Sequence, residues 1–223
     1  QTCALPILGL TSPFGLNTRY PVEGPFNTAA TFATLPLLDI KPTVAYKVTD
    51  NLSIGLGADI YTFAGFLGEG QAEQHQVGSG LGGIPAGAKV ELSGKGTGVG
   101  MNASLVYTPI RNSDGKPLAS IGMVYRSQAV LPLQGGLLIN GAKVADASTS
   151  LALPPIYTGG VALWPVRTPE REWKLELNVD FVAWKAHKDL NIYLSNGTTL
   201  PQARDRKSTR LNSSHGYISY AVF

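Results

Sequence analysis

The stretch WKLELNVDF, residues 173–181, alternates between apolar and polar side chains at every position. Successive side chains of a β-strand point to opposite faces, so this period of two predicts a strand with one apolar and one charged face. The apolar face would carry Trp173, Leu175, Leu177, Val179 and Phe181, and the polar face Lys174, Glu176, Asn178 and Asp180. We therefore expect the strand to separate two different environments.

The same alternation recurs along most of the chain. It predicts roughly seven strands, near residues 8–14, 34–48, 52–63, 97–109, 118–131, 149–164 and 173–186. The connections are long at 15–33, 64–96, 132–148 and from 187 onward, and short at 49–51, 111–117 and 165–172. Long loops at one end and tight turns at the other are typical of outer-membrane barrels. The sequence therefore predicts an all-β fold, an antiparallel transmembrane β-barrel with long extracellular loops.

Two other interpretations are compatible with this pattern. A soluble, secreted β-sandwich used for binding or adhesion buries its apolar rows between two sheets, which gives the same alternation. A non-selective porin shares the barrel but has a charged, conducting lumen. The long strands and the regular change in loop length favour the barrel. Trp164 and Trp173 flank a short turn, where an aromatic girdle would lie.

Two groups of residues are candidates for a functional site. Charged residues on the polar faces would line a wet barrel interior, namely Arg126, Lys174, Glu176 and Asp180. The long segment 64–96 mixes apolar residues with many glycines, and an apolar surface that captures a ligand is one explanation; self-packing of a long loop is another. The candidates for that surface are Phe63, Phe66, Leu67, Leu81 and Ile84.

Nothing in the sequence predicts catalysis. The string GSGLGG, residues 78–83, has the glycine spacing of a dinucleotide-binding loop, but it lacks the strand before and the helix after that such a loop needs. His75 and His187 have no carboxylate or second histidine at the spacing of a metal site or a catalytic triad. We expect no catalytic residue, no metal and no cofactor, and we interpret 78–83 as a flexible loop.

The two ends of the chain are related to each other at the level of DNA. Residues 205–211, DRKSTRL, can be encoded by a string whose reverse complement translates as QTCALPI, residues 1–7. The string resembles a sequencing-library adapter, whose continuation accounts for most of 212–223. We therefore interpret 1–7 and 205–223 as adapter-derived, and 8–204 as the native segment, a partial β-barrel.

This interpretation changes the charge and the cysteine content. The tail carries three basic residues, Arg206, Lys207 and Arg210, and one acid, Asp205, so the formal charge falls from +3 to +1. The one cysteine, Cys3, is set aside too, which excludes disulfides and thiolate metal sites from 8–204. A nearly neutral segment gives no reason to expect a nucleic-acid partner. No apolar run is long enough for a transmembrane helix.

Several strings, taken in order, resemble the FadL/TodX family of outer-membrane transporters for hydrophobic compounds. They are PFGLNTRY (13–20), AYKVTDNLSIGLG (45–57), VYRS (124–127) and LALPP (151–155). Trp184 falls where the family has a tryptophan after its Pro/Trp turn. The resemblance covers essentially all of 8–204 and implies a barrel of roughly fourteen antiparallel strands plugged by an N-terminal hatch. This chain would be an internal fragment that supplies about half of that wall.

The resemblance also implies a function and partners. It implies a channel that takes up hydrophobic molecules, either long-chain fatty acids or neutral hydrocarbons, by capture at the outer loops, passage into the barrel and gated release. The expected location is the bacterial outer membrane, with outer-membrane lipid and a hydrophobic small molecule as partners and a monomer as the oligomeric state. Pro13 and Gly15 are the candidates for a strand kink, because proline cannot donate to the hydrogen-bond ladder.

One position departs from the family pattern. Fatty-acid-transporting members place a basic residue just before a Phe-Ala-Gly string, whereas here Thr62 precedes Phe63. A buried carboxylate without a cationic partner is costly. The sequence therefore predicts a neutral or weakly polar hydrocarbon as the ligand, unless another cation, for instance Arg126, meets a carboxylate.

Overall fold

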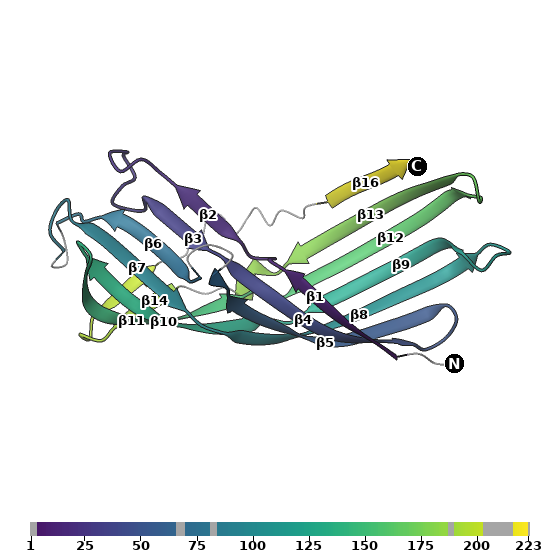
Figure 1. The fold of residues 1–223 in the computed structure, drawn as a ribbon, viewed down its shortest axis with the longest axis horizontal. Helices are drawn as coiled ribbons and strands as arrows, with labels where there is room; N and C mark the ends of the chain where they lie inside the picture. The colour runs from purple at the N-terminus through teal and green to yellow at the C-terminus, as the bar shows by residue number, and fades with distance from the viewer. Residues whose placement is uncertain (1–3, 66–69, 81–83, 187–189, 203–215, 223) are drawn as a thin grey trace.

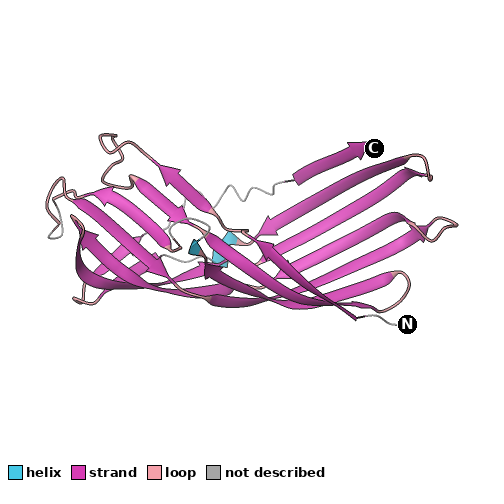
Figure 2. Ribbon diagram, viewed as in Figure 1, coloured by secondary structure: helices cyan, strands magenta, loops and turns pink. Residues whose placement is uncertain are grey.

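A computed structural model describes residues 4–65, 70–80, 84–186, 190–202 and 216–222, with side chains up to residue 200. Strands make up most of the described residues, and the helical residues lie near the middle of the molecule in space (Figure 2). The 3-10 helix η2 spans Trp184–Ala186. Within the described residues, no helix has the length and apolar character needed to span a membrane.

The strands form two eight-stranded sheets, and every pair of neighbours is antiparallel. The order in sheet A is β1 (Ala4–Thr11), β4 (Leu37–Lys47), β5 (Leu52–Phe63), β8 (Gly98–Arg111), β9 (Pro117–Arg126), β12 (Ile156–Arg167), β13 (Glu172–Val182) and β16 (Gly216–Val222). The order in sheet B is β2 (Leu16–Arg19), β3 (Phe32–Leu35), β6 (Ala72–Val77), β7 (Lys89–Lys95), β10 (Ala129–Ile139), β11 (Ala142–Leu153), β14 (Leu190–Leu194) and β15 (Thr199–Gln202).

The two sheets are successive halves of one wall. The chain passes from a strand of one sheet into a strand of the other, so the order of sheet B repeats the order of sheet A strand for strand. Figure 1 shows the two halves meeting at a bend. We call this bend the crease. Within the described residues, the chain crosses it at 12–15, 36, 96–97, 127–128 and 154–155.

Proline and glycine explain several of these crossings. Pro36 and the pair Pro154–Pro155 have no N–H group, so they cannot continue the hydrogen-bond ladder. At Gly96 an added Cβ atom would lie 1.9 Å from the carbonyl oxygen of Pro132, so only glycine allows the neighbouring strand to approach this closely. The crease is therefore encoded locally at these crossings.

The seven strands expected from the sequence correspond to β1, β4, β5, β8, β9, β12 and β13 of sheet A. The expected short turns also form: Asn112 N donates to Lys116 O (2.9 Å), and Thr168 N donates to Arg171 O (2.8 Å). The expectation of long loops was wrong for much of the four segments, because they form strands instead. Segments 15–33, 64–96, 132–148 and 187 onward contain strands of sheet B. One such strand is β6, AEQHQV, which is polar on both faces and therefore lacks an alternating signal.

Sheet A exposes its apolar rows and turns its polar rows inward. Along β13 the apolar side chains from Trp173 to Phe181 are 45–54% exposed, while the polar side chains between them are half-buried. Other strands of sheet A expose Val44, Leu56, Met101 and Met123 in the same way. A soluble β-sandwich would cover these rows with a second sheet, so the arrangement is that of a barrel wall in lipid.

Exposed aromatic side chains border this apolar surface at both ends. Tyr46, Tyr107 and Trp173 lie toward the short turns, and Tyr125, Tyr157 and Phe181 lie toward the crease. Eight residue steps separate Trp173 from Phe181, or about 27 Å along the strand. That length suits a tilted strand across an apolar band about 25 Å tall.

Trp164 was expected in the same girdle, and this expectation was wrong. A register shift interrupts the β12–β13 pairing between Leu163 and Val166, and the Trp164 ring lies on the inner side with two cations. The Arg167 guanidinium carbon is 4.7 Å from its centroid and Lys174 Nζ is 5.6 Å from it. Its indole N–H donates to Glu172 (2.8 Å).

The buried apolar residues form two clusters on the inner face. The crease cluster consists of Leu37, Tyr61, Ala129, Leu131, Leu133 and Leu153, with Phe14, Leu35, Phe63 and Leu151 packed against it. The second cluster lies within sheet B and consists of Val90, Leu137, Ala145, Ala147, Ile192 and Leu194. The hydrophobic core therefore begins at the crease and continues along the inner face of sheet B.

Candidate functional site

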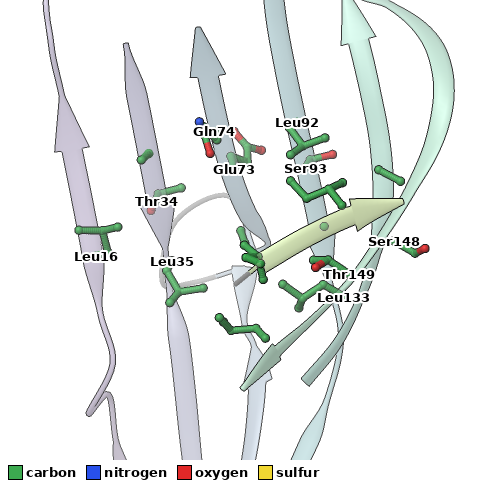
Figure 3. A pocket seen from close by; sticks show the side chains of 17 residues that line it. Leu16, Thr34, Leu35, Glu73, Gln74, Leu92, Ser93, Leu133, Ser148 and Thr149 are labelled. Carbon is green, nitrogen blue, oxygen red and sulfur yellow. The ribbon is translucent and has the colours of Figure 1, made fainter. Parts of the chain in front are cut away.

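A cavity of about 220 Å³ lies on the inner face of sheet B. Strands β2, β3, β6, β7, β10, β11 and β14 all contribute to its lining, because the sheet curves around it. Figure 3 shows the lining side chains. The side chains on the cavity side include the apolar Leu16, Leu35, Leu92, Leu133, Leu151 and Ile192 and the polar Gln74 and Thr149. Thr34, Glu73, Ser93 and Ser148 border the cavity, but their positions in the strand pairing belong to the opposite face of the sheet.

The cavity contains no positively charged lining residue among the described residues, and the charged residue at its border is Glu73, which pairs with Ser93 on the opposite face of the sheet. Glu73 is occupied on both oxygens: Gln71 donates to Oε1 at 2.6 Å, and His75 Nε2 lies 3.1 Å from Oε2. A cavity with apolar walls and one satisfied carboxylate suits a neutral apolar molecule. It offers no counter-charge for an anionic ligand.

Apolar contact continues from the cavity to the crease. Leu35, Leu133 and Leu151 line the cavity and also pack in the crease cluster. Phe14, which lies between β1 and β2, contacts two further rings: its centroid is 6.3 Å from Tyr61 and 6.1 Å from Trp184. These three rings come from the β1–β2 crossing, β5 and η2, so segments far apart in the sequence meet at the crease.

A polar cluster occupies the inner face of sheet A on the other side of the crease. Lys41 Nζ and Arg126 Nη1 each lie 3.8 Å from Asp39 Oδ2. Asn102 Nδ2 donates to Asp59 Oδ1 at 2.8 Å. We call these five residues the polar cluster. Asp39 and Asp59 are fully buried, and burial of a charge is tolerated only when it is paired or hydrogen-bonded.

The expected lumen residues lie on the inner face of the structure and do not form one site. Arg126 joins Asp39 in the polar cluster. On β13, Lys174 forms an ion pair with Glu176, Asn178 Nδ2 also donates to Glu176 (2.9 Å), and Thr158 donates to Asp180. Each of these carboxylates is already paired, so the row stabilises the wall rather than presenting a reactive acid and base.

The expected capture residues have different positions. Phe63 packs against the crease cluster, and Ile84 packs against the second apolar cluster of sheet B. Neither lines the cavity of about 220 Å³. Phe66, Leu67 and Leu81 lie outside the described residues.

Sequence reasoning missed the side chains that line the cavity. Leu16 and Leu133 are examples, since 15–33 and 132–148 were interpreted as loops. A signal was present: Ala129, Leu131 and Leu133 alternate with exposed residues along β10. That period of two would have extended the strand pattern into the segment.

The residues expected at a strand kink lie where the strand is interrupted. Pro13 and Gly15 fall in the gap between β1, which ends at Thr11, and β2, which begins at Leu16. Ser12 Oγ donates to Leu37 O at 2.7 Å and holds this crossing against β4. The interruption places the Phe14 ring among the aromatic residues of the crease.

Comparison with known proteins agrees with this geometry. The family model described as outer membrane protein transport protein (OMPP1/FadL/TodX) matches residues 7–218, and so extends into the segment 205–223. No curated protein matches the chain by sequence.

Two solved structures share the fold. A Pseudomonas aeruginosa FadL homologue is 18% identical with a TM-score of 0.66, and the match covers 89% of this chain and 51% of that one. The Ralstonia pickettii toluene transporter TbuX is 19% identical with a TM-score of 0.60, and the match covers 88% of this chain and 58% of that one. The chain therefore spans a little over half the length of these relatives. It belongs to the OMPP1/FadL/TodX family of transport proteins, which reside in the outer membrane.

Proposed function

We propose that the protein takes up hydrophobic molecules across the outer membrane and that this chain forms part of the channel wall. The observation that carries the proposal is the continuous apolar surface from the cavity of sheet B to the crease, where the wall passes into sheet A with its apolar outer face. An apolar molecule can leave water in the cavity and remain in apolar contact as far as the crease.

The proposed ligand is a neutral or weakly polar hydrocarbon. The cavity wall has no cation among the described residues, and Thr62, where fatty-acid-transporting relatives have a basic residue, contacts the hydroxyl of Thr97 at 3.3 Å. Arg126 is the cation that we considered as a substitute, but it is paired with Asp39 on the far side of the crease. A carboxylate in the cavity would therefore stay unpaired, which is costly.

Release at the crease is the second part of the proposal. Beyond the crease, an apolar molecule would meet Asp39, Lys41, Asp59 and Arg126 and would gain nothing from further movement along the lumen. The strand interruption at Pro13–Gly15 lies at this level. We infer that the ligand leaves the barrel sideways there, after the Phe14 ring moves away from Tyr61 and Trp184. The apolar crease also argues against a non-selective, water-filled pore.

Uptake measurements test both parts. The full-length protein that carries this chain is reconstituted in vesicles, and uptake of toluene and of oleate is followed in parallel. We expect faster uptake of toluene. In a variant with cysteines in place of Phe14 and Trp184, a disulfide that ties the β1–β2 crossing to η2 should make uptake slower than in the same variant after reduction. Strict preference for oleate would overturn the neutral-ligand proposal. Free ion conductance without uptake of either compound would overturn the transport proposal itself.

A further inference from the structure

The outer face of sheet B carries two adjoining polar hollows of about 300 and 330 Å³. They lie between β10, β11 and β14 and share Gln134, Ser148 and Tyr193. These three residues are direct cross-strand partners, because Gln134 pairs with Ser148 and Ser148 pairs with Tyr193. The hollows therefore form one continuous groove across three strands. It lies on the face opposite to the apolar cavity.

The lining has an unusual combination of chemistry. Tyr193 presents an exposed ring, 54% accessible, among amides and hydroxyls. Within the described part of the chain, the side chains of Gln134, Ser148, Asn191 and Tyr193 form no hydrogen bond with another residue. Several donors and acceptors therefore surround one aromatic face and are free to bind a ligand.

The lining excludes several classes of ligand. Among the described residues that line the groove there is no lysine or arginine, and Lys95, the cross-strand partner of Gln134, lies at its border. One lysine at the border is too little counter-charge for a nucleic-acid backbone. Asp146 is the one carboxylate of the lining and is paired with Lys143 Nζ at 2.5 Å, so a metal ion lacks ligands. The polar walls do not suit an acyl chain. A neutral molecule with many hydroxyl groups and an apolar ring face meets every feature of the lining.

The position of the groove indicates where such a molecule comes from. The apolar outer face of sheet A faces lipid, and sheet B continues this wall beyond the crease, where the connections 20–31 and 78–88 are longer than the turns of sheet A. Long connections lie on the extracellular side of outer-membrane barrels. The outer face of sheet B is therefore next to the sugar-bearing headgroups of the surrounding outer-leaflet lipid.

We propose that Gln134, Ser148, Asn191 and Tyr193 form a binding site for a neutral hexose unit in the glycan of the outer-membrane lipid that surrounds the barrel. The C–H face of the sugar ring packs on the Tyr193 ring, which combines an apolar body with a polar hydroxyl. The amides of Gln134 and Asn191 and the hydroxyl of Ser148 exchange hydrogen bonds with the ring hydroxyls. This site is independent of the proposed transport function, because it lies on the opposite face of the sheet.

Saturation-transfer NMR tests the site with maltotriose as the neutral probe and glucose 6-phosphate as the anionic comparison. The full-length protein in detergent should saturate the ring protons of maltotriose, and glucose 6-phosphate should give a weaker signal. Tyr193→Ala should weaken maltotriose binding about tenfold, whereas Tyr193→Phe, which keeps the ring, should stay within about twofold of the original protein. Tyr20→Ala is the matched control, since Tyr20 is an exposed tyrosine just after β2 at the other edge of sheet B.

A second measurement tests the source of the sugar. Vesicles that contain lipopolysaccharide with a full neutral glycan should bind the protein more tightly than vesicles with truncated lipopolysaccharide, and Tyr193→Ala should remove the difference. Heat-modifiable mobility in gels verifies that each variant is folded. Equal maltotriose binding by Tyr193→Ala and Tyr20→Ala overturns the site. Equal binding to the two kinds of vesicle overturns its assignment to the lipid glycan.

Discussion

Sheets A and B have opposite polarity although they are halves of the same wall. In sheet A the outer face is apolar and the inner face carries paired charges. In sheet B the inner face is apolar and much of the outer face is polar, for example at Gln134, Asp146, Ser148 and Asn191. In sheet A the wall therefore has its apolar face outside, toward lipid, and its polar face inside. In sheet B, on the other side of the crease, the apolar face is inside and the polar face is outside.

The exchange of faces depends on short irregularities at the crease. In β9 the even-numbered residues up to Arg126 point inward, whereas in β10 the odd-numbered Ala129, Leu131 and Leu133 do. Ser127 and Gln128 between them shift the alternation by one residue, which moves a whole strand pattern to the other face. Pro154 and Pro155 separate β11 from β12 in the same way. The membrane boundary is thus encoded in a few residues.

Removing a charge from the inner face of sheet A should have the largest effect. Asp39→Ala leaves Lys41 and Arg126 without their shared carboxylate in a buried position, and we expect a loss of about 3–5 kcal/mol in the free energy of unfolding. Urea titration of the full-length protein in lipid vesicles measures it. Thr11→Ala removes one weaker hydrogen bond to the same carboxylate (3.3 Å) and serves as the control. Equal stability of both variants would mean that the polar cluster does not hold the strands together.

An arginine on the outer face distinguishes the two sheets directly. Leu177→Arg places a charge in the middle of the apolar face of sheet A, and we expect a cost of about 2–4 kcal/mol in vesicles. Ser148→Arg places the same charge on the outer face of sheet B and should change stability by about 0.5 kcal/mol or less. Similar costs at the two positions would contradict the exchange of polarity at the crease.

The smallest effect on stability is expected at the short turn between β4 and β5, which lies at the end of sheet A away from the crease. Lys47 Nζ lies 2.6 Å from Asp50 Oδ1 and holds the pKa of the Asp50 carboxyl below its usual range. A lowered pKa contributes stability above the unfolded pKa, and this contribution is lost as the pH falls through the folded pKa. The pair is exposed, so the contribution is small. Lys47→Met should raise the pKa of Asp50 toward its ordinary value in an NMR titration; an unchanged titration would show that the pair is not formed in solution.

Period-two alternation was sufficient to predict seven strands of sheet A and the separation of their apolar and polar rows. It was insufficient for sheet B. Strand β6 is polar on both faces, and the pairing of its backbone with β3 and β7 is a tertiary effect that leaves no periodic signal. The cavity was missed for the same reason, because Leu16, Leu92 and Leu151 converge only when sheet B curves.

The crossings were only partly predictable. Pro13 indicated an interruption, but the contact of Phe14 with Trp184 joins residues from distant parts of the sequence. The inward turn of Trp164 depends on a register shift in β12. Local sequence therefore indicates where a strand breaks, whereas packing decides which way the side chain points.

The most direct test of the exchange of polarity is a spin label at two positions on the outer face. In the full-length protein, single cysteines replace Leu177 on sheet A and Ser148 on sheet B, and the labelled proteins are reconstituted in lipid vesicles. Electron paramagnetic resonance then measures the collision rate of each label with lipid-soluble oxygen and with a water-soluble nickel chelate. We predict that oxygen dominates at position 177 and the nickel chelate at position 148. The same accessibility at both positions would contradict a membrane boundary at the crease.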